Sequence, residues 1–155
     1  MDLQNAFIRN AKKIKPSVVS VNKVKELFEK SSWYEPHGTI PWYAPIRNWF
    51  ADNLKTRKYS VENVGSGIIL DSNGYILTNY HVVENLDRVL VKLSDGKEYF
   101  AKVLGYDTYT DLAALKISTL RRLPEPDFGE SKSLNVGEWV MAIGNPYGLE
   151  GTVTV

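Results

Sequence analysis

The feature that most constrains this chain is a series of short apolar runs between residues 61 and 117, separated by turn residues. β-branched and aromatic residues fill the runs, and Asn73-Gly74 is a dipeptide typical of a hairpin turn. Crossover helices, which parallel strands require, do not fit between runs so closely spaced. We therefore expect an all-β fold built on a small antiparallel barrel rather than on βαβ units. The expected strands are 17–22, 66–70, 75–78, 88–93, 98–105 and 111–117.

Two other segments flank this barrel. Residues 2–14 are predicted to be helical, because Asp2 can cap a helix, the apolar residues fall mostly on one face, and Pro16 ends the pattern. After a proline-containing linker at 122–135, a strand is expected at 138–143 and the start of another at 152–155, with a glycine-containing turn between them.

Residues 23–60 interrupt the strand pattern. They contain three of the four tryptophans, together with several prolines, and a short helix is expected at 45–54. Disordered segments are poor in aromatic residues, so this insertion is expected to be ordered or functional. Two interpretations stay open: a small satellite core under a long loop, or a loop that contacts a partner through its Trp and Tyr residues.

The composition excludes several classes of function. A net charge of +1 gives no electrostatic reason to expect nucleic acid or an anionic membrane as a partner. No apolar run has the length of a membrane span, and no secretory signal opens the sequence. Without cysteine there are no disulfides, and with only His37 and His81 a metal site is not expected. No cofactor is expected either.

The candidate chemistry lies in His81, just beyond the strand at 75–78, and Asp111, at the start of the strand at 111–117. A neutral histidine is a poor base unless its tautomer is fixed, and a buried carboxylate can fix it. Each residue alone also fits a structural role, as a strand-end histidine and as a cap or turn residue. Asp71, Asp95 and Asp107 are expected to be turn residues without chemistry.

Five blocks of sequence occur in an order that closely resembles the HtrA (DegP-type) serine proteases, which have the chymotrypsin fold. The resemblance runs from Pro16 to Val155 and is weakest in the insertion. The blocks are Gly65-Ser66-Gly67-Ile68-Ile69-Leu70, Gly74-Tyr75-Ile76-Leu77-Thr78-Asn79-Tyr80-His81-Val82-Val83, Leu93-Ser94-Asp95-Gly96, Asp111-Leu112-Ala113-Ala114-Leu115-Lys116-Ile117 and Ala142-Ile143-Gly144-Asn145-Pro146-Tyr147-Gly148.

The resemblance implies that His81 is the general base of a serine endopeptidase and Asp111 its orienting carboxylate. It implies a helix at 1–15, a first trypsin-like barrel at 16–121 with the loop insertion 23–60, a linker at 122–135 and the start of a second barrel at 136–155. By the same resemblance, the insertion occupies the place of a regulatory loop that contacts other subunits, and the helix lies where the family has segments used in trimer assembly. The implied substrates are unfolded or misfolded proteins in a periplasmic or other extracytoplasmic compartment, as in protein quality control.

One departure from the family is informative. Its nucleophilic serine lies in a Gly-Asn-Ser-Gly-Gly motif, and none of the serines in this sequence has that context. Ser66, between two glycines, matches a strand entry of the family rather than its nucleophile. Because the oxyanion-hole donors that speed acyl transfer about 10²–10³-fold each would also be missing, the 155-residue chain alone is expected to be inactive.

Two rival functions stay open at this point. The first is a non-catalytic, protease-like interaction module, in which the barrel and its aromatic loop bind a partner. The second is a nucleic-acid-binding barrel, which is disfavoured because the aromatic residues lack a dense basic surround. The residues at 138–155 are also expected to expose apolar side chains and to promote self-association. The side chains concerned are those of Val140, Ile143, Val153 and Val155.

Overall fold

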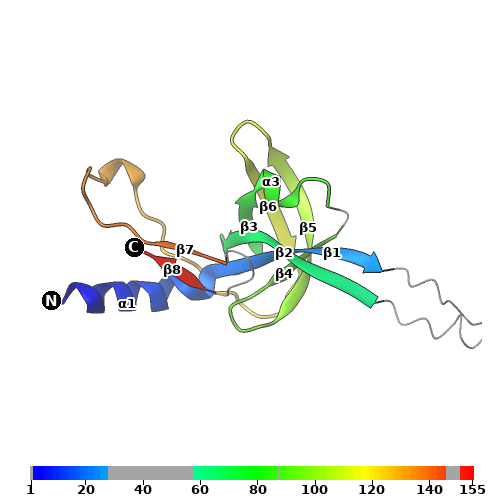
Figure 1. The fold of residues 1–155 in the computed structure, drawn as a ribbon, viewed down its shortest axis with the longest axis horizontal. Coiled ribbons are helices and arrows are strands. Elements are labelled where there is room, and N and C mark those ends of the chain that lie inside the picture. The colour runs from blue at the N-terminus through cyan, green and yellow to red at the C-terminus, as the bar shows by residue number, and fades with distance from the viewer. Residues whose placement is uncertain (1, 28–57, 87, 146–150) are drawn as a thin grey trace, which may run out of the picture. The chain divides into compact units, whose positions relative to one another are not determined.

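The computed structural model describes residues 2–27, 58–86, 88–145 and 151–155 (Figure 1). The chain divides into two compact units, one formed by Met1–Val24 with Val61–Val155 and the other by Lys25–Ser60. The first unit contains most of the barrel and the candidate site. The short helix expected at 45–54 lies outside the described residues.

An amphipathic helix opens the chain, as predicted. Helix α1 covers Leu3–Ile14, and Asp2 is its N-cap, with the carboxylate accepting a hydrogen bond of 3.2 Å from the backbone N–H of Gln4. Such a bond satisfies one of the N–H groups that a helix start leaves without a partner. The helix ends in a 3₁₀ turn, Lys15–Ser17, where Pro16 cannot donate the hydrogen bond that would continue it.

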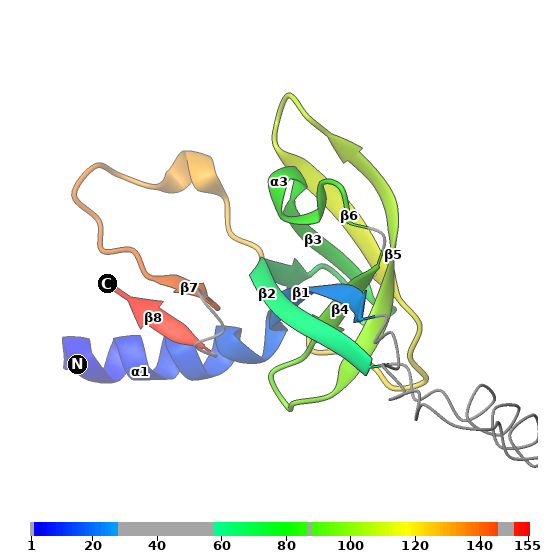
Figure 2. The ribbon, with the colours of Figure 1, turned by 45° about the vertical axis from the view of Figure 1, so that its right-hand side comes forward.

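Six strands then close into a barrel in the order β1-β2-β3-β6-β5-β4 (Figure 2). Strand β3 pairs antiparallel with β2 and β6, and β4 pairs antiparallel with β1 and β5. Because the sheet closes on itself, the described barrel strands leave no long edge open to other chains. The predicted antiparallel barrel is therefore confirmed. The strands are β1 (Val18–Leu27), β2 (Lys58–Ile69), β3 (Tyr75–Asn79), β4 (Val89–Lys92), β5 (Glu98–Asp107) and β6 (Leu112–Ile117).

The first two strands are longer than the sequence pattern indicated. β1 runs on to Leu27 and β2 begins at Lys58, so both ends of the expected insertion at 23–60 belong to barrel strands. The cause is strand pairing: Lys23 lies opposite Val89 in the β1–β4 ladder. Tertiary hydrogen bonding extends the strands beyond the apolar run that predicted them.

The barrel interior is filled by aliphatic side chains that alternate along the strands. In β6, for example, Ala113, Leu115 and Ile117 are buried while the residues between them are more exposed. Leu123 joins this core from the segment expected to be a linker, and its N–H donates to the carbonyl of Ser72 at 3.3 Å. The expected boundary between barrel and linker at 121–122 is therefore not sharp, because Leu123 of the linker packs in the barrel core. The other core residues are Val19, Val21, Ile69, Ile76, Val82, Val83, Val89, Val91 and Leu93.

The turn between β2 and β3 has the expected chemistry. The carboxylate of Asp71 accepts hydrogen bonds from the backbone N–H groups of Asn73 and Tyr75, at 3.0 and 3.1 Å, and the Asn73 side chain lowers the pKa of Asp71 most. Gly74 has a φ of +101°, and a Cβ on it would lie 2.6 Å from the carbonyl oxygen of Ile117. Glycine is therefore required here both by backbone conformation and by the close approach of β6.

The expected strand at 138–143 is wrong in its extent. The structure has β7 at Ala142–Gly144, which pairs with β8 at Thr152–Thr154. The physical reason is that β8 offers only three residues for pairing, whereas the ring of Trp139 packs edge-on against Phe7 of α1 with 6.0 Å between centroids. Trp139 thus contacts the helix instead of taking part in strand pairing.

Candidate functional site

The candidate site is built where β3 ends and a one-turn helix begins. Helix α3 covers Tyr80–Val83 and was not expected from the sequence. Val82 and Val83 are buried in the barrel core and anchor the turn, while about two thirds of the His81 side chain is exposed. The turn therefore presents His81 at the barrel rim, and the packing of Val82 and Val83 in the core holds the turn in place.

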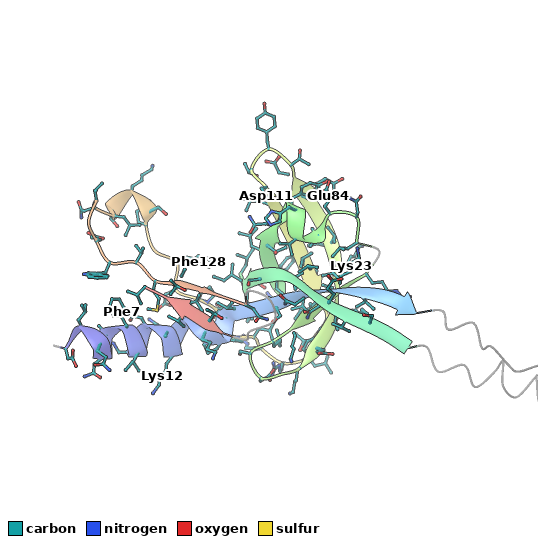
Figure 3. The ribbon with its side chains drawn as sticks, in the orientation of Figure 1. Phe7, Lys12, Lys23, Glu84, Asp111 and Phe128 are labelled. Atoms are coloured by element: carbon teal, nitrogen blue, oxygen red, sulfur yellow. The ribbon has the colours of Figure 1, made fainter. Side chains whose placement is uncertain are left out.

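Asp111 reaches the same rim from the turn between β5 and β6. The β3–β6 ladder pairs Asn79 with Leu112, and this register places Asp111 beside the first residues of α3. Asp111 has a φ of +55°, in the left-handed region that Asp tolerates better than most residues. The pairing of the two strands thus brings together two residues that are thirty positions apart in the sequence. Figure 3 labels Asp111 at the upper end of the barrel.

The carboxylate of Asp111 contacts both the ring and the backbone of His81. Its Oδ2 lies 2.7 Å from His81 Nδ1, and its Oδ1 accepts a hydrogen bond of 2.9 Å from the His81 N–H. The backbone bond from His81 and then its ring lower the pKa of Asp111 below the ordinary 3.8, so the carboxylate is ionised at neutral pH. An ionised carboxylate only accepts hydrogen bonds, so Nδ1 is the donor and Nε2 of a neutral ring is free to accept a proton.

The site is more open than a buried-carboxylate arrangement would be. The side chain of Asp111 is 43% exposed. Asp111 is partly exposed because it belongs to a hairpin turn at the rim rather than to the barrel interior. Its tautomer-fixing contacts are nevertheless complete, since both oxygens are engaged by His81.

Comparison with known proteins places this geometry in a family. Residues 65–155, more than half of the chain, match the trypsin-like peptidase domain. The chain belongs to the trypsin-like peptidase domain family. Within that family it is similar to DegP-like and HtrA-type serine proteases, and it matches part of their length.

Three curated relatives illustrate this. A probable periplasmic serine endoprotease DegP-like of Bartonella henselae is 39% identical over 97% of this chain and 33% of its own length. The corresponding protein of Hahella chejuensis is 41% identical over 90% of this chain and 30% of its own length. The putative serine protease HhoB of Synechocystis is 40% identical over 97% of this chain and 35% of its own length. The chain thus spans about a third of the length of these relatives.

A solved structure supports the same assignment. The HtrA-type protease AlgW with decapeptide superposes with a TM-score of 0.72 and 35% identity, over 94% of this chain and 43% of that one. The all-β fold of trypsin-like type is therefore confirmed. No helix among the described residues is long and apolar enough to cross a membrane.

Ser66, the serine of the Gly-Ser-Gly block of this trypsin-like domain, has a structural role. Its Oγ accepts a hydrogen bond of 2.6 Å from the N–H of Asn145, and its carbonyl accepts one of 2.7 Å from Thr78. The buried Asn145 side chain also donates to Ser20 Oγ. These bonds attach Asn145, the residue that follows β7, to the barrel.

A pair of tyrosines beside the candidate base was not expected from the sequence. The rings of Tyr80 on α3 and Tyr106 on β5 stack with 4.7 Å between centroids, and the Tyr80 hydroxyl donates to Glu84 at 3.1 Å. Desolvation, followed by the bond to Glu84, raises the pKa of Tyr80. Both contacts brace the helix that contains His81. The sequence contains one signal for the Tyr80–Glu84 contact, because the two residues are four positions apart and such residues are neighbours on a helix. That signal is useful only once the helix is known.

A cavity of about 640 Å³ lies next to the site, between α1, the barrel and β7. Asn79 and Leu112, the neighbours of the His81–Asp111 pair, form part of its wall. Its other walls are mainly aliphatic, so this part of the trypsin-like domain has an apolar hollow beside its polar pair. Among the described residues, no group of three or more His, Cys, Asp or Glu side chains is arranged to hold a metal ion. The aliphatic lining residues are Ile14, Val18, Ile68, Leu77, Met141 and Ile143.

Proposed function

We propose that this chain is the N-terminal part of the protease domain of an HtrA-type serine endopeptidase, with His81 as general base and Asp111 as its orienting carboxylate. The observation that carries the proposal is the bond of 2.7 Å between His81 Nδ1 and Asp111 Oδ2. It is supported by the second bond, from the His81 N–H to Oδ1, which fixes the carboxylate relative to the backbone. A base held in one tautomer by an ionised partner is what nucleophilic catalysis by serine requires.

In the proposed reaction a serine attacks the carbonyl carbon of a peptide bond. His81 Nε2 accepts the proton of the serine and then donates it to the leaving amine, so that the peptide bond breaks as the acyl–serine bond forms. Asp111 remains ionised and stabilises the imidazolium. We place the serine outside these 155 residues, in a Gly-Asn-Ser-Gly-Gly segment, and we expect the 155-residue chain by itself to be inactive.

The names of the relatives support the proposed compartment. Several relatives are named periplasmic serine endoproteases, which supports an extracytoplasmic location for the parent protein. The proposed substrates are unfolded or misfolded proteins, as in protein quality control. The proposed layout is a helix at 1–15, a first barrel at 16–121 with the insertion 23–60, a linker at 122–135 and the start of a second barrel at 136–155.

Labelling with a fluorophosphonate tests this proposal. The full-length product of the gene is expected to cleave casein and to be labelled on one serine that lies outside residues 1–155. The 155-residue chain, assayed at the same concentration, is expected to show neither cleavage nor labelling. Labelling of Ser66 or casein cleavage by the 155-residue chain would contradict the proposed division of the site. A full-length product without any activated serine would favour an interaction module instead.

Self-association is a second expected property of the 155-residue chain. Val140, Val153 and Val155 are 66%, 40% and 57% exposed, whereas Ile143, expected to be uncovered as well, is partly buried. Val153 belongs to a hairpin with only two described strands. Exposed apolar strands pair with other chains. Light scattering is therefore expected to show oligomers whose mass rises with concentration. Val153→Lys should shift the chain toward monomer, whereas Val61→Lys, at a 50% exposed valine of β2, should not. A strict monomer over a wide concentration range would contradict this expectation.

A further inference from the structure

Asp111 is held by more than the histidine. Its carbonyl oxygen accepts hydrogen bonds from the N–H of Tyr80, at 3.0 Å, and from Nδ2 of Asn79, at 3.1 Å. The same Asn79 amide also lies 3.2 Å from Asp111 Oδ2, the oxygen that binds the ring of His81. One side-chain amide thus bridges the backbone and the carboxylate of Asp111, and it shares Oδ2 with the candidate base.

The position of Asn79 makes this arrangement unusual. Asn79 is the last residue of β3 and the N-cap of α3, where an asparagine normally uses its side-chain oxygen to accept a helix N–H. Its side chain makes no such capping bond. The Asp111 carboxylate instead accepts the N–H of His81, the second residue of the helix. The residue at the cap position is therefore a donor to Asp111, and the capping is done from the neighbouring turn.

Asp111 needs such a donor because its backbone and its carboxylate are both constrained. A non-glycine residue in the left-handed region, here with a φ of +55°, is disfavoured unless local hydrogen bonds compensate. The side chain is partly exposed and could rotate toward solvent. A donor that grips the carbonyl and Oδ2 together opposes both movements, and bonds of N–H groups to an ionised oxygen are stronger than neutral ones.

We propose that Asn79 is a positioning residue for the His81–Asp111 pair, and that its amide N–H keeps Oδ2 of Asp111 directed at Nδ1 of His81. This inference rests on the proposed function. Asn79 acts through Asp111, and the proton donor of its side chain is the essential group. Its effect is therefore expected on the rate of the chemical step and on the histidine tautomer rather than on substrate affinity.

Two substitutions separate this role from helix capping. Asn79→Asp keeps the shape and the capping ability of asparagine, since Asp and Asn are equally good N-caps, but it removes the N–H donor and adds a negative charge. Asn79→Ala removes both the donor and the capping ability of the side chain. In the full-length protein, both variants are expected to lower kcat for a peptide substrate about 10-fold, with KM changed by less than 2-fold.

Asn73 provides a matched control. Its side-chain amide also donates to an aspartate, Asp71 Oδ2, at 2.9 Å, but in the β2–β3 turn. Asn73→Ala is expected to leave kcat within 2-fold of the wild-type protein. If Asn79→Asp retains the wild-type kcat, the N–H donor of Asn79 is not required and the proposal is overturned. If Asn79→Ala does so, the amide is not required, and the proposal is overturned as well.

A spectroscopic readout makes the test independent of activity. In ¹⁵N NMR spectra of the protein at a pH where the ring is neutral, His81 is expected to show a protonated Nδ1, and both Asn79 variants are expected to shift the population toward protonated Nε2. An unchanged tautomer in folded Asn79 variants would overturn the proposal. If the wild-type protein proves not to be a peptidase, the proposed function fails, while the tautomer still decides the role of Asn79.

Discussion

Replacing Asp111 by Asn in the full-length protein is expected to lower kcat about 10⁴-fold, the loss that follows when a serine-protease triad loses its carboxylate. The reason is the tautomer of His81. In the wild-type protein the Asp111 carboxylate accepts the proton of Nδ1 over 2.7 Å. An asparagine in its place can donate an N–H to Nδ1 instead, which moves the ring proton to Nε2 and removes the base. The measurement is steady-state hydrolysis of a peptide substrate at neutral pH.

Asp107 offers a matched control in the same hairpin. Its carboxylate accepts from the Tyr109 N–H at 2.9 Å and from the Thr110 hydroxyl at 2.8 Å, and these two bonds lower its pKa. Asp107→Asn removes a turn carboxylate without touching His81 and should change kcat by less than about 3-fold, as for a surface turn. A protein that keeps a tenth of its activity after Asp111→Asn would contradict the role proposed for Asp111.

The barrel was predictable because its signal is repeated in every strand. Alternating apolar residues, together with Gly74 and Asp71 at one hairpin, define strands whose register follows from burying one face. The extent of β7 and the presence of α3 were not predictable on the same basis. A one-turn helix is shorter than any periodic window, and the contact between Trp139 and Phe7 joins residues that are 132 positions apart.

The candidate site also has features that the sequence predicts and features that it does not. That His81 and Asp111 could form a pair followed from their chemistry and from the family motif, and the structure places them within hydrogen-bonding distance. The bridging role of Asn79 depends on the register of β3 against β6 and on the left-handed backbone of Asp111. Neither property is visible in the residue types, because an asparagine before a helix predicts a cap. Exposure of the carboxylate was likewise hidden, since it depends on the position of the turn.

The stability of the barrel that carries this site depends on strand β6, which follows Asp111. The second large effect, on the free energy of unfolding, is therefore expected at Leu115. This residue lies in β6, between Ile76 of β3 and Val103 of β5, and it is 0% exposed. Leu115→Ala is expected to lower the free energy of unfolding by about 2–5 kcal/mol, because the lost contacts leave a cavity that a closed barrel cannot collapse. At about 2–4 °C per kcal/mol, the midpoint of thermal unfolding should fall by roughly 4–20 °C.

Leu120 is the matched control for this substitution, because it is fully exposed just after the same strand. Leu120→Ala should change the free energy of unfolding by no more than about 0.5 kcal/mol. Urea unfolding of both variants measures the difference, and a loss below about 1 kcal/mol for Leu115→Ala would mean that the barrel repacks around the gap.

Below its lowered midpoint the Leu115→Ala protein should still present His81 and Asp111 in contact, because Val82, Val83 and the β3–β6 register, rather than Leu115 itself, position them. In this variant the stability is therefore expected to change without a change in site geometry. The folded Leu115→Ala protein should have a normal His81 tautomer but a lower unfolding temperature.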